Sequence, residues 1–427
     1  MEHPILVRVP DVLLSTVLSA SSLASDVTIP EPTSIAGGNG TPADWLAFAL
    51  GVVIVVSTAA TVTRTLIMTR ESRRGIADVT AIGLRRSVGF IAQRFKSYRT
   101  RDKIQSWVAP LMIIGSLSTW LVCFLFGYMF MLQGSLGLDP AVAFREAGSS
   151  LFTLGFASHD RGQLSIIDFI AAATGPITIG LMISYLPALY GAFNTRELEV
   201  ALLKARAGEP NWGPEILARF AALDTDHERL VSLWSTWERW AADVSESHTT
   251  YPPLIYTRSA RPMRNWLIAL LSVMDAAALT LALRPHDRQV VPRILLRQGV
   301  ECMRDLAAAT NIRYDPHLVT GAPIQLSKEE FLDGVKVMTE AGYKVQRSPE
   351  DAWPYFSDWR MTYESIAYQL ASRIDAVPAK WSGPRRPPTE PIPPFRPSYV
   401  VANPDGSLKF PEPTKKHKLV PPRKRLG

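Results

Sequence analysis

The chain has 427 residues, a formal net charge of +7 and two cysteines. Its length allows two or three domains, and its mean hydropathy of +0.06 is high for a soluble protein but modest for a protein that is apolar throughout. The apolar residues are concentrated in the first half of the chain. Two cysteines exclude a disulfide framework and a cysteine-based zinc site, and we expect Cys123 and Cys302 to be inert apolar side chains.

Residues 1–43 are predicted to be a flexible leader. They include a mildly apolar stretch at residues 12–24, which follows the single basic residue Arg8. This stretch fits a cleaved signal peptide or a disordered or interfacial N-terminus, and its interrupting serines favour the second. Residues 44–69 form the first predicted transmembrane helix, because a span needs about 20 mainly apolar residues.

Residues 70–106 are predicted to form a basic cytoplasmic loop. Ten Lys and Arg residues lie between positions 70 and 103, against three acidic residues, and the positive-inside rule places such a loop in the cytoplasm. Residues 76–95 mix apolar and basic positions at loosely helical spacing, which is typical of a helix lying on anionic lipid. Nucleic-acid binding is the rival interpretation, and the position of the loop between two spans disfavours it.

Two further apolar runs, at residues 107–132 and 166–193, are predicted to cross the membrane. The first contains no charged residue, and basic residues follow the second. The charge bias of the loops predicts three spans with the N-terminus outside and the C-terminus in the cytoplasm. We therefore expect a multi-pass protein of the plasma (inner) membrane.

The third span contains several glycines and prolines, which membrane helices tolerate at bends and close contacts. Gly175 and Gly180 are predicted to mark a bend in a pore-lining inner helix. Ordinary helix packing through small residues is the alternative.

Residues 207–377 are predicted to form a soluble, all-helical cytoplasmic domain. Its predicted helices cover residues 214–223, 226–244, 263–283, 288–310, 328–342 and 351–375. Trp234, Trp237 and Trp240 recur at three-residue spacing, which favours a buried stripe over a ligand cage. Residues 266–283 resemble a fourth span, but Asp275 and the shortness of the run favour a buried helix.

Residues 378–427 contain thirteen prolines and eleven Lys and Arg residues. Such a composition cannot bury a core, because too few large apolar side chains are available. We expect a disordered, partly extended tail that is attracted to anionic membranes.

Residues 144–160 are too short to cross a bilayer, yet they lie between two predicted spans. Irregular backbone at membrane depth is tolerated where it is buried in protein or lines a water-filled cavity, which favours a re-entrant pore loop. A carbonyl-lined cation filter needs a short helix pointing its C-terminal dipole at the pore, a hydroxyl, a flexible glycine and a packing aromatic ring. Residues 142–151 supply the helix, and Thr153, Gly155 and Phe156 supply the other three parts.

At these residues the chain resembles the potassium-channel pore family, whose filter reads Thr-Val/Leu-Gly-Tyr/Phe-Gly-Asp. Thr153, Leu154, Gly155 and Phe156 match four consecutive positions of this motif, and the resemblance covers residues 107–206. The chain looks like the bacterial branch of the family, with an added N-terminal span and a large cytoplasmic domain. The resemblance implies a homotetramer in the bacterial inner membrane whose filter carbonyls bind dehydrated potassium ions. No cofactor or resident metal is implied beyond this permeant monovalent cation.

Two positions depart from the family motif. The second glycine is Ala157 and the aspartate is Ser158. A left-handed backbone costs alanine roughly 1 kcal/mol or more relative to glycine, so we expect an altered filter or the loss of an outer ion site. Asp160 is expected to replace the missing charge, and Ser150 and Asp160 are predicted to belong to the pore helix and vestibule.

The predicted fold class is mainly α, with integral membrane helices, a re-entrant pore helix and filter loop, and the helical cytoplasmic domain. The predicted function is a cation channel, with potassium as the expected ion, gated or regulated by the cytoplasmic domain. Membrane lipids are the expected partners, nucleic acid is not, and a cytoplasmic ligand or partner is left open. The alternative is a non-conducting membrane-anchored scaffold or sensor.

An enzyme is not expected. Ser, Glu and His lie close together at Ser245, Glu246, Ser247 and His248, and Asp275 interrupts an apolar run. Neighbouring positions do not make a catalytic triad, because its groups must converge in space with a base and an orienting acid. Satisfied polar contacts in a helical core are therefore the favoured interpretation of His248 and Asp275.

Overall fold

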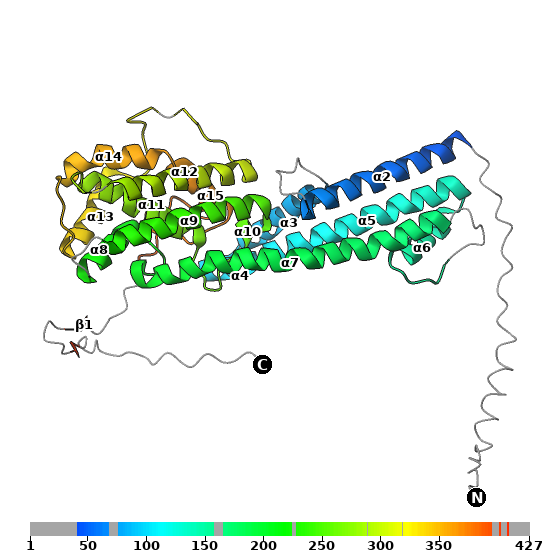
Figure 1. The fold of residues 1–427 in the computed structure, drawn as a ribbon, viewed down its shortest axis with the longest axis horizontal. Coiled ribbons are helices and arrows are strands. Elements are labelled where there is room, and N and C mark those ends of the chain that lie inside the picture. Colours follow the sequence, from blue (N-terminus) through cyan, green and yellow to red (C-terminus); the bar gives the residue numbers. More distant parts are fainter. Residues whose placement is uncertain are drawn as a thin grey trace, which may run out of the picture. The chain divides into compact units, whose positions relative to one another are not determined.

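The computed structural model describes residues 41–67, 76–157, 165–223, 228–287, 289–317, 319–394, 401–402 and 408–409. The structure is mainly helical (Figure 1). Its helices are α2 (Pro42–Leu66), α3 (Ile76–Ala92), α4 (Tyr98–Gln105), α5 (Val108–Leu136), α6 (Pro140–Leu151), α7 (Ser165–Ala207), α8 (Gly213–Leu223), α9 (Glu228–Thr250), α10 (Pro253–Tyr256), α11 (Trp266–Leu283), α12 (Val290–Thr310), α13 (Lys328–Glu340), α14 (Pro349–Met361) and α15 (Glu364–Arg373). Strands β1 (Val401–Ala402) and β2 (Leu408–Lys409) pair antiparallel. The predicted leader lies, up to residue 40, outside the described residues.

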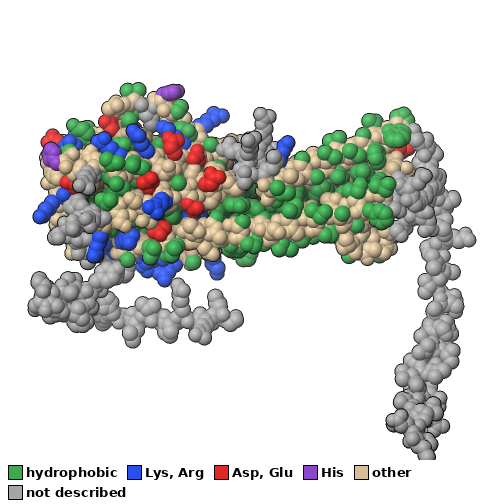
Figure 2. Space-filling model, viewed as in Figure 1, with side chains coloured by type: hydrophobic (Ala, Val, Ile, Leu, Met, Phe, Trp, Pro, Cys, Tyr) green, Lys and Arg blue, Asp and Glu red, His purple; other side chains and the backbone are tan. Residues whose placement is uncertain are grey.

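Four helices among the described residues, namely α2, α5, α7 and α11, are long and apolar enough to cross a membrane. In the most apolar window of α2, 17% of the residues are buried, and the share is 28% in the stretches that contain α5 and α7. Figure 2 shows many apolar side chains on the surface formed by α2, α5 and α7. Their length and composition indicate a multi-pass membrane protein. The corresponding share in α11 is 100%, which confirms the buried helix predicted for residues 266–283.

The described residues divide into two compact units, of which the first consists of those within residues 1–58 and 122–176. Glycines set the distance between the parts of α2 and α5 in this unit. A Cβ atom on Gly51 would lie 2.6 Å from the carbonyl oxygen of Gly127, and a Cβ atom on Gly134 would lie 2.4 Å from a backbone oxygen of α2. Such close backbone contact is typical of helix packing in membranes, where small residues lie at the interface.

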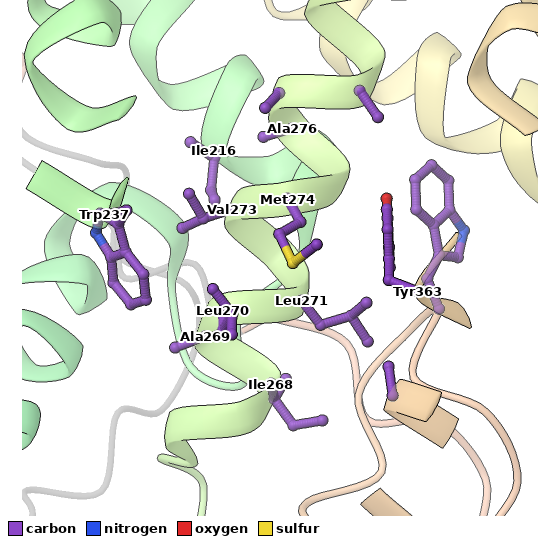
Figure 3. Close-up of a cluster of buried hydrophobic side chains, with 14 of the residues drawn as sticks. Ile216, Trp237, Ile268, Ala269, Leu270, Leu271, Val273, Met274, Ala276 and Tyr363 are labelled. Atoms are coloured by element: carbon purple, nitrogen blue, oxygen red, sulfur yellow. The ribbon is translucent and has the colours of Figure 1, made fainter. Parts of the chain in front are cut away.

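The second unit consists of residues 59–121 and 177–427 and is built around α11. All 18 residues of α11 are buried, and helices α8, α9, α12, α14 and α15 pack against it. The Asn265 side chain caps its start by accepting hydrogen bonds from two backbone amides at 3.0 and 3.2 Å. Figure 3 shows Trp237 of α9 on one side of α11 and Tyr363, which precedes α15, on another.

The tryptophan stripe of α9 lies in the same core, as predicted. Trp234, Trp237 and Trp240 are all buried, and the rings of Trp237 and Trp240 lie 4.5 Å apart. The indole nitrogen of Trp240 also donates a hydrogen bond to the backbone oxygen of Arg196 at 3.0 Å. The stripe therefore joins the helical core to the end of α7.

The single helix predicted for residues 351–375 is wrong, because the structure has two helices there. α14 ends at Met361 and α15 begins at Glu364. The break lets Arg360 and the hydroxyl of Tyr363 both reach Asp275 of α11. A buried carboxylate needs such partners, so tertiary contacts outweigh the helical propensity of the segment.

The prediction that the disordered tail begins at residue 378 is also wrong. Trp381, Ser382 and Arg385 are buried, and the rings of Trp381 and Trp212 lie 5.6 Å apart. Arg385 donates hydrogen bonds to several backbone carbonyls, including that of Ala376 at 2.7 Å. Trp381 and Arg385 thus anchor this proline-rich segment in the core. Its low average hydrophobicity had predicted that it could not pack. Beyond residue 394 the structure describes only the two short strands.

Candidate functional site

The short helix α6 lies between two of the membrane helices and begins at a capped end. Asp139 accepts a hydrogen bond from the amide of Ala141 at 2.9 Å, and Pro140 occupies the first helical turn. Both features favour a helix start, since proline needs no amide partner there. Buried side chains recur on one face at Ala143, Ala147 and Leu151. The predicted pore helix at residues 142–151 therefore corresponds to α6.

The C-terminus of α6 carries a strained residue. Its amides are bonded in a Schellman pattern, from Thr153 to the oxygen of Ser150 at 3.0 Å and from Leu154 to the oxygen of Ser149 at 2.8 Å. This pattern places Thr153 at the left-handed position that glycine usually occupies, with φ of 53°. A β-branched residue with positive φ is a genuine outlier. Such strain persists only where the surrounding structure imposes it, and it clusters at functional sites.

The predicted filter residues form an exposed loop after this turn. Leu154 and Phe156 are 60% and 59% exposed, and Gly155 has φ of 70°. The hydroxyl of Thr153 donates to the oxygen of Phe152 at 2.8 Å, and the guanidinium of Arg145 lies 5.9 Å from the centre of the Phe156 ring. The side chains of Leu154 and Phe156 are thus left uncovered. The backbone beside them has a positive φ at Thr153 and again at Gly155.

Ala157 does not adopt a left-handed backbone, and its effect on an ion filter stays a prediction. Ala157 is not among the described residues with positive φ, whereas Thr153 and Gly155 are. The amide of Ala157 donates instead to the hydroxyl of Ser149 at 3.0 Å. This side-chain bond holds the loop back against α6, and the positive φ lies at Thr153, four residues nearer the helix. Ser158 and Asp160 lie outside the described residues.

Side-chain contacts fix α6 against α7 and α5 within the first unit. The hydroxyl of Ser150 donates to Asp168 of α7 at 2.7 Å, and the rings of Phe126 and Phe144 lie 6.1 Å apart. The vestibule role of Ser150 stays a prediction. Its bond to Asp168 gives this side chain a definite position beside the loop.

Gly175 and Gly180 differ in their surroundings. A Cβ atom on Gly175 would lie 2.0 Å from the oxygen of Leu151, the last residue of α6, whereas one on Gly180 would meet nothing within 4 Å. α7 is one continuous helix through both positions. The predicted bend stays a prediction, and at Gly175 the structure favours the alternative of close helix packing.

Sequence reasoning missed Glu146 and Ser149 in this site. Glu146 is 2% exposed on the buried face of α6, and Ser149 holds the amide of Ala157. Burying an ionisable side chain is costly, so Glu146 is a functional candidate. In the sequence, Glu146 could have been found as a carboxylate next to Ala147, on the helix face that also carries Ala143.

The residues considered for catalysis lie in the second unit and do not form a nucleophile and base. The hydroxyl of Ser247 lies 3.0 Å from Nδ1 of His248, and Nη1 of Arg196 lies 3.1 Å from Nε2. An arginine can only donate, so Nε2 accepts and the ring proton resides on Nδ1. That nitrogen has no lone pair to take a proton from Ser247, and His248 is fully buried.

Burial, together with the charge of Arg196, lowers the pKa of His248 well below its usual value. The unfolded chain binds a proton at this histidine below about pH 6.5, while the folded chain does not, so acid favours unfolding. We expect the free energy of unfolding to fall below this pH by up to about 1.4 kcal/mol per pH unit through this group alone. Thermal melting of the full chain in detergent between pH 7.5 and 5 measures this dependence.

The variant His248→Gln should flatten the acid side of that profile, because glutamine can still accept from Arg196 without titrating. The exposed His317 provides the matched control, and His317→Gln should leave the profile unchanged. Equal slopes for the wild type and His248→Gln would refute the assignment of His248 as neutral in the folded state.

The carboxylate of Asp275 is likewise held by hydrogen-bond partners in the core. It accepts hydrogen bonds from Arg360 and from the hydroxyl of Tyr363, the latter at 2.8 Å. No group of three or more metal-ligating side chains occurs among the described residues.

Comparisons of the chain with models of protein families, with curated proteins and with solved structures find no match.

Proposed function

We propose that the chain is one subunit of a membrane cation channel in which the loop at residues 153–157 contributes the ion path. The observation that carries the proposal is the left-handed Thr153 at the end of α6. Glycine is the usual residue at such a helix end, so a threonine held there in a strained conformation points to a use for its hydroxyl. The match of residues 153–156 to a potassium filter supplies that use.

The electrostatics of α6 support a cation as the ligand. A helix C-terminus carries a partial negative charge from its aligned peptide dipoles, and the loop begins at this end of α6. Backbone carbonyls and a threonine hydroxyl are hard oxygen ligands that can replace the hydration shell of a monovalent cation. Potassium is the proposed ion.

The exposed apolar loop supports assembly of several subunits. Phe152, Leu154 and Phe156 are 43%, 60% and 59% exposed, and such side chains are usually covered by a partner surface. Four copies arranged around an axis would bring four loops together, so we propose a homotetramer. The helical domain, rich in buried ion pairs, would regulate this pore, and a non-conducting scaffold or sensor is the competing outcome.

Ion flux through purified full-length protein in liposomes tests the proposal. Wild-type protein should pass potassium, and Thr153→Ala and Gly155→Ala should lower the flux at least about tenfold, the effect of losing about 1.4 kcal/mol of ion coordination. Thr153→Gly should do the same while melting at an equal or higher temperature, because it relieves roughly 1 kcal/mol of backbone strain. A native mass of the detergent-solubilised protein should correspond to four chains.

Matched controls are available in the membrane helices. Thr65→Ala removes an exposed hydroxyl of α2, and Gly191→Ala adds a methyl group where nothing lies within 4 Å. Both should conduct like the wild type. If potassium, sodium and rubidium all fail to permeate over a range of voltage, pH and lipid composition, the channel is refuted and the scaffold or sensor is favoured.

A further inference from the structure

A cavity of about 220 Å³ lies within the second unit, between α3, the start of α5, α10 and the end of α15. Its polar lining is dominated by basic and amide side chains, which are Arg85, Arg86, Gln93, Gln105, Arg373 and Arg386. The sequence distance between α3 and Arg386 shows that folding, and not a local run of charge, gathers these groups. None of them takes part in the loop at residues 153–157.

The charge of the cavity is not balanced by protein carboxylates. Within the described residues, no carboxylate forms an ion pair with Arg85, Arg86 or Arg386. The carboxylate in the lining belongs to Asp375, which already accepts hydrogen bonds from Arg101 at 3.0 Å and from Gln105 at 3.1 Å. The cavity therefore holds an excess of positive charge.

Two of the arginines lie close enough to repel each other. Burial and then the charge of Arg85 lower the pKa of Arg373 from its usual value, and the guanidinium of Arg85 lies 5.5 Å from the centre of the Tyr256 ring. A bound anion would relieve this repulsion, because it attracts both guanidinium groups.

We propose that this cavity binds a phosphate group, and that an anionic phospholipid headgroup presents it. The planar guanidinium matches phosphate oxygens with paired hydrogen bonds, and the cavity has room for a phosphate with part of its ester. Basic pockets beside membrane helices are a recurring form of headgroup recognition. The proposal does not depend on conduction by the chain.

The surroundings of the cavity favour a lipid as the source of the phosphate. Helix α3 exposes Val79, Phe90 and Ile91 by 67%, 63% and 51%, and Phe90 also lines the cavity. Apolar side chains next to basic ones are typical of a helix at a membrane surface. An acyl chain could lie on this face while the headgroup enters the cavity.

Two glycines of α3 give a matched pair of variants. Gly89 lines the cavity and Gly83 does not, and a Cβ atom on either would meet nothing within 4 Å. Gly89→Glu therefore adds a carboxylate to the lining without a steric clash, and Gly83→Glu adds the same charge to the same helix elsewhere. A second pair compares Arg86→Gln/Arg386→Gln with Arg94→Gln/Arg99→Gln, which removes two positive charges outside the cavity.

The test is native mass spectrometry of the full chain in detergent, titrated with phosphatidylglycerol, phosphatidylcholine or inorganic pyrophosphate. Wild-type protein should bind phosphatidylglycerol more tightly than phosphatidylcholine. Gly89→Glu and Arg86→Gln/Arg386→Gln should weaken that binding by about tenfold or more, the effect of losing one charge-assisted hydrogen bond. Gly83→Glu and Arg94→Gln/Arg99→Gln should stay within about twofold of the wild type.

The outcomes separate the sources of the phosphate. Pyrophosphate binding that Gly89→Glu abolishes, without lipid binding, would retain the phosphate site and assign it to a soluble anion. Equal loss in both glycine variants, equal binding of the two lipids without pyrophosphate binding, or no binding of any probe would overturn the proposal. Unchanged melting temperatures of the variants show that the protein is still folded.

Discussion

Arg360→Met is expected to lower the free energy of unfolding of the helical domain by about 3–5 kcal/mol, because it leaves buried carboxylates without their cation. Arg360 is fully buried and bonds Asp275 of α11 and, at 2.9 Å, Glu364 of α15. It also donates to the backbone oxygen of Trp381 at 2.6 Å. One guanidinium therefore connects α11, α15 and the segment at Trp381. Thermal or urea unfolding of the full chain in detergent measures its loss.

A surface ion pair provides the control for Arg360. Arg304 and Glu301 lie 3.1 Å apart with side chains 34% and 60% exposed, and such pairs contribute at most about 1 kcal/mol. Arg304→Met should thus change stability little. The double variant Arg360→Met/Asp275→Leu should be more stable than Arg360→Met alone, since it removes one of the stranded charges. A loss below about 1 kcal/mol for Arg360→Met would contradict the role given to this network.

Gly175→Val is expected to have the second large effect, which falls on the first unit. A Cβ atom at this position would lie 2.0 Å from the backbone oxygen of Leu151, and a backbone atom cannot turn aside as a side chain can. Overpacking of this kind costs about 1–3 kcal/mol and shifts the backbone. The end of α6 would move away from α7, together with Thr153 and its loop, so we expect lower thermal stability and loss of ion flux in liposomes.

The variant Gly180→Val distinguishes two interpretations of the α7 glycines, namely close helix packing and a bend that serves as a hinge. Nothing lies within 4 Å of a Cβ atom at Gly180, so packing alone predicts that this variant folds and conducts like the wild type. If Gly180 is instead a hinge for opening, the variant should fold normally but change the open probability. Normal folding and flux in Gly175→Val would contradict the close approach that the structure shows at Leu151.

The sequence predicted much of the fold because its strongest signals are local. Long apolar runs marked α2, α5 and α7, and the tryptophan spacing marked the buried face of α9. Asp275 and the shortness of its run were enough to identify α11 as a buried helix. The break between α14 and α15 could not be predicted in this way, because it depends on Arg360 and Tyr363 reaching a partner 85 or more positions earlier.

In the candidate site, the motif at residues 153–156 and its preceding helix were visible in the sequence. The position of backbone strain was not, because it depends on which amides α6 bonds at its end. Those bonds place Thr153 in the left-handed region and give the amide of Ala157 to Ser149. The role of Gly175 likewise depends on a backbone oxygen from another helix.

The sequence by itself determined the apolar helices, the amphipathic α3 and the filter-like motif, since hydrophobic spacing and turn residues act within one segment. Only the tertiary structure decided which charges meet. It paired Arg360 with Asp275, and it gathered Arg85, Arg86, Arg373 and Arg386 around one cavity. Desolvated charge is controlled by neighbours from distant segments, and for that reason the ion-pair network and the proposed phosphate site became visible only in the folded chain.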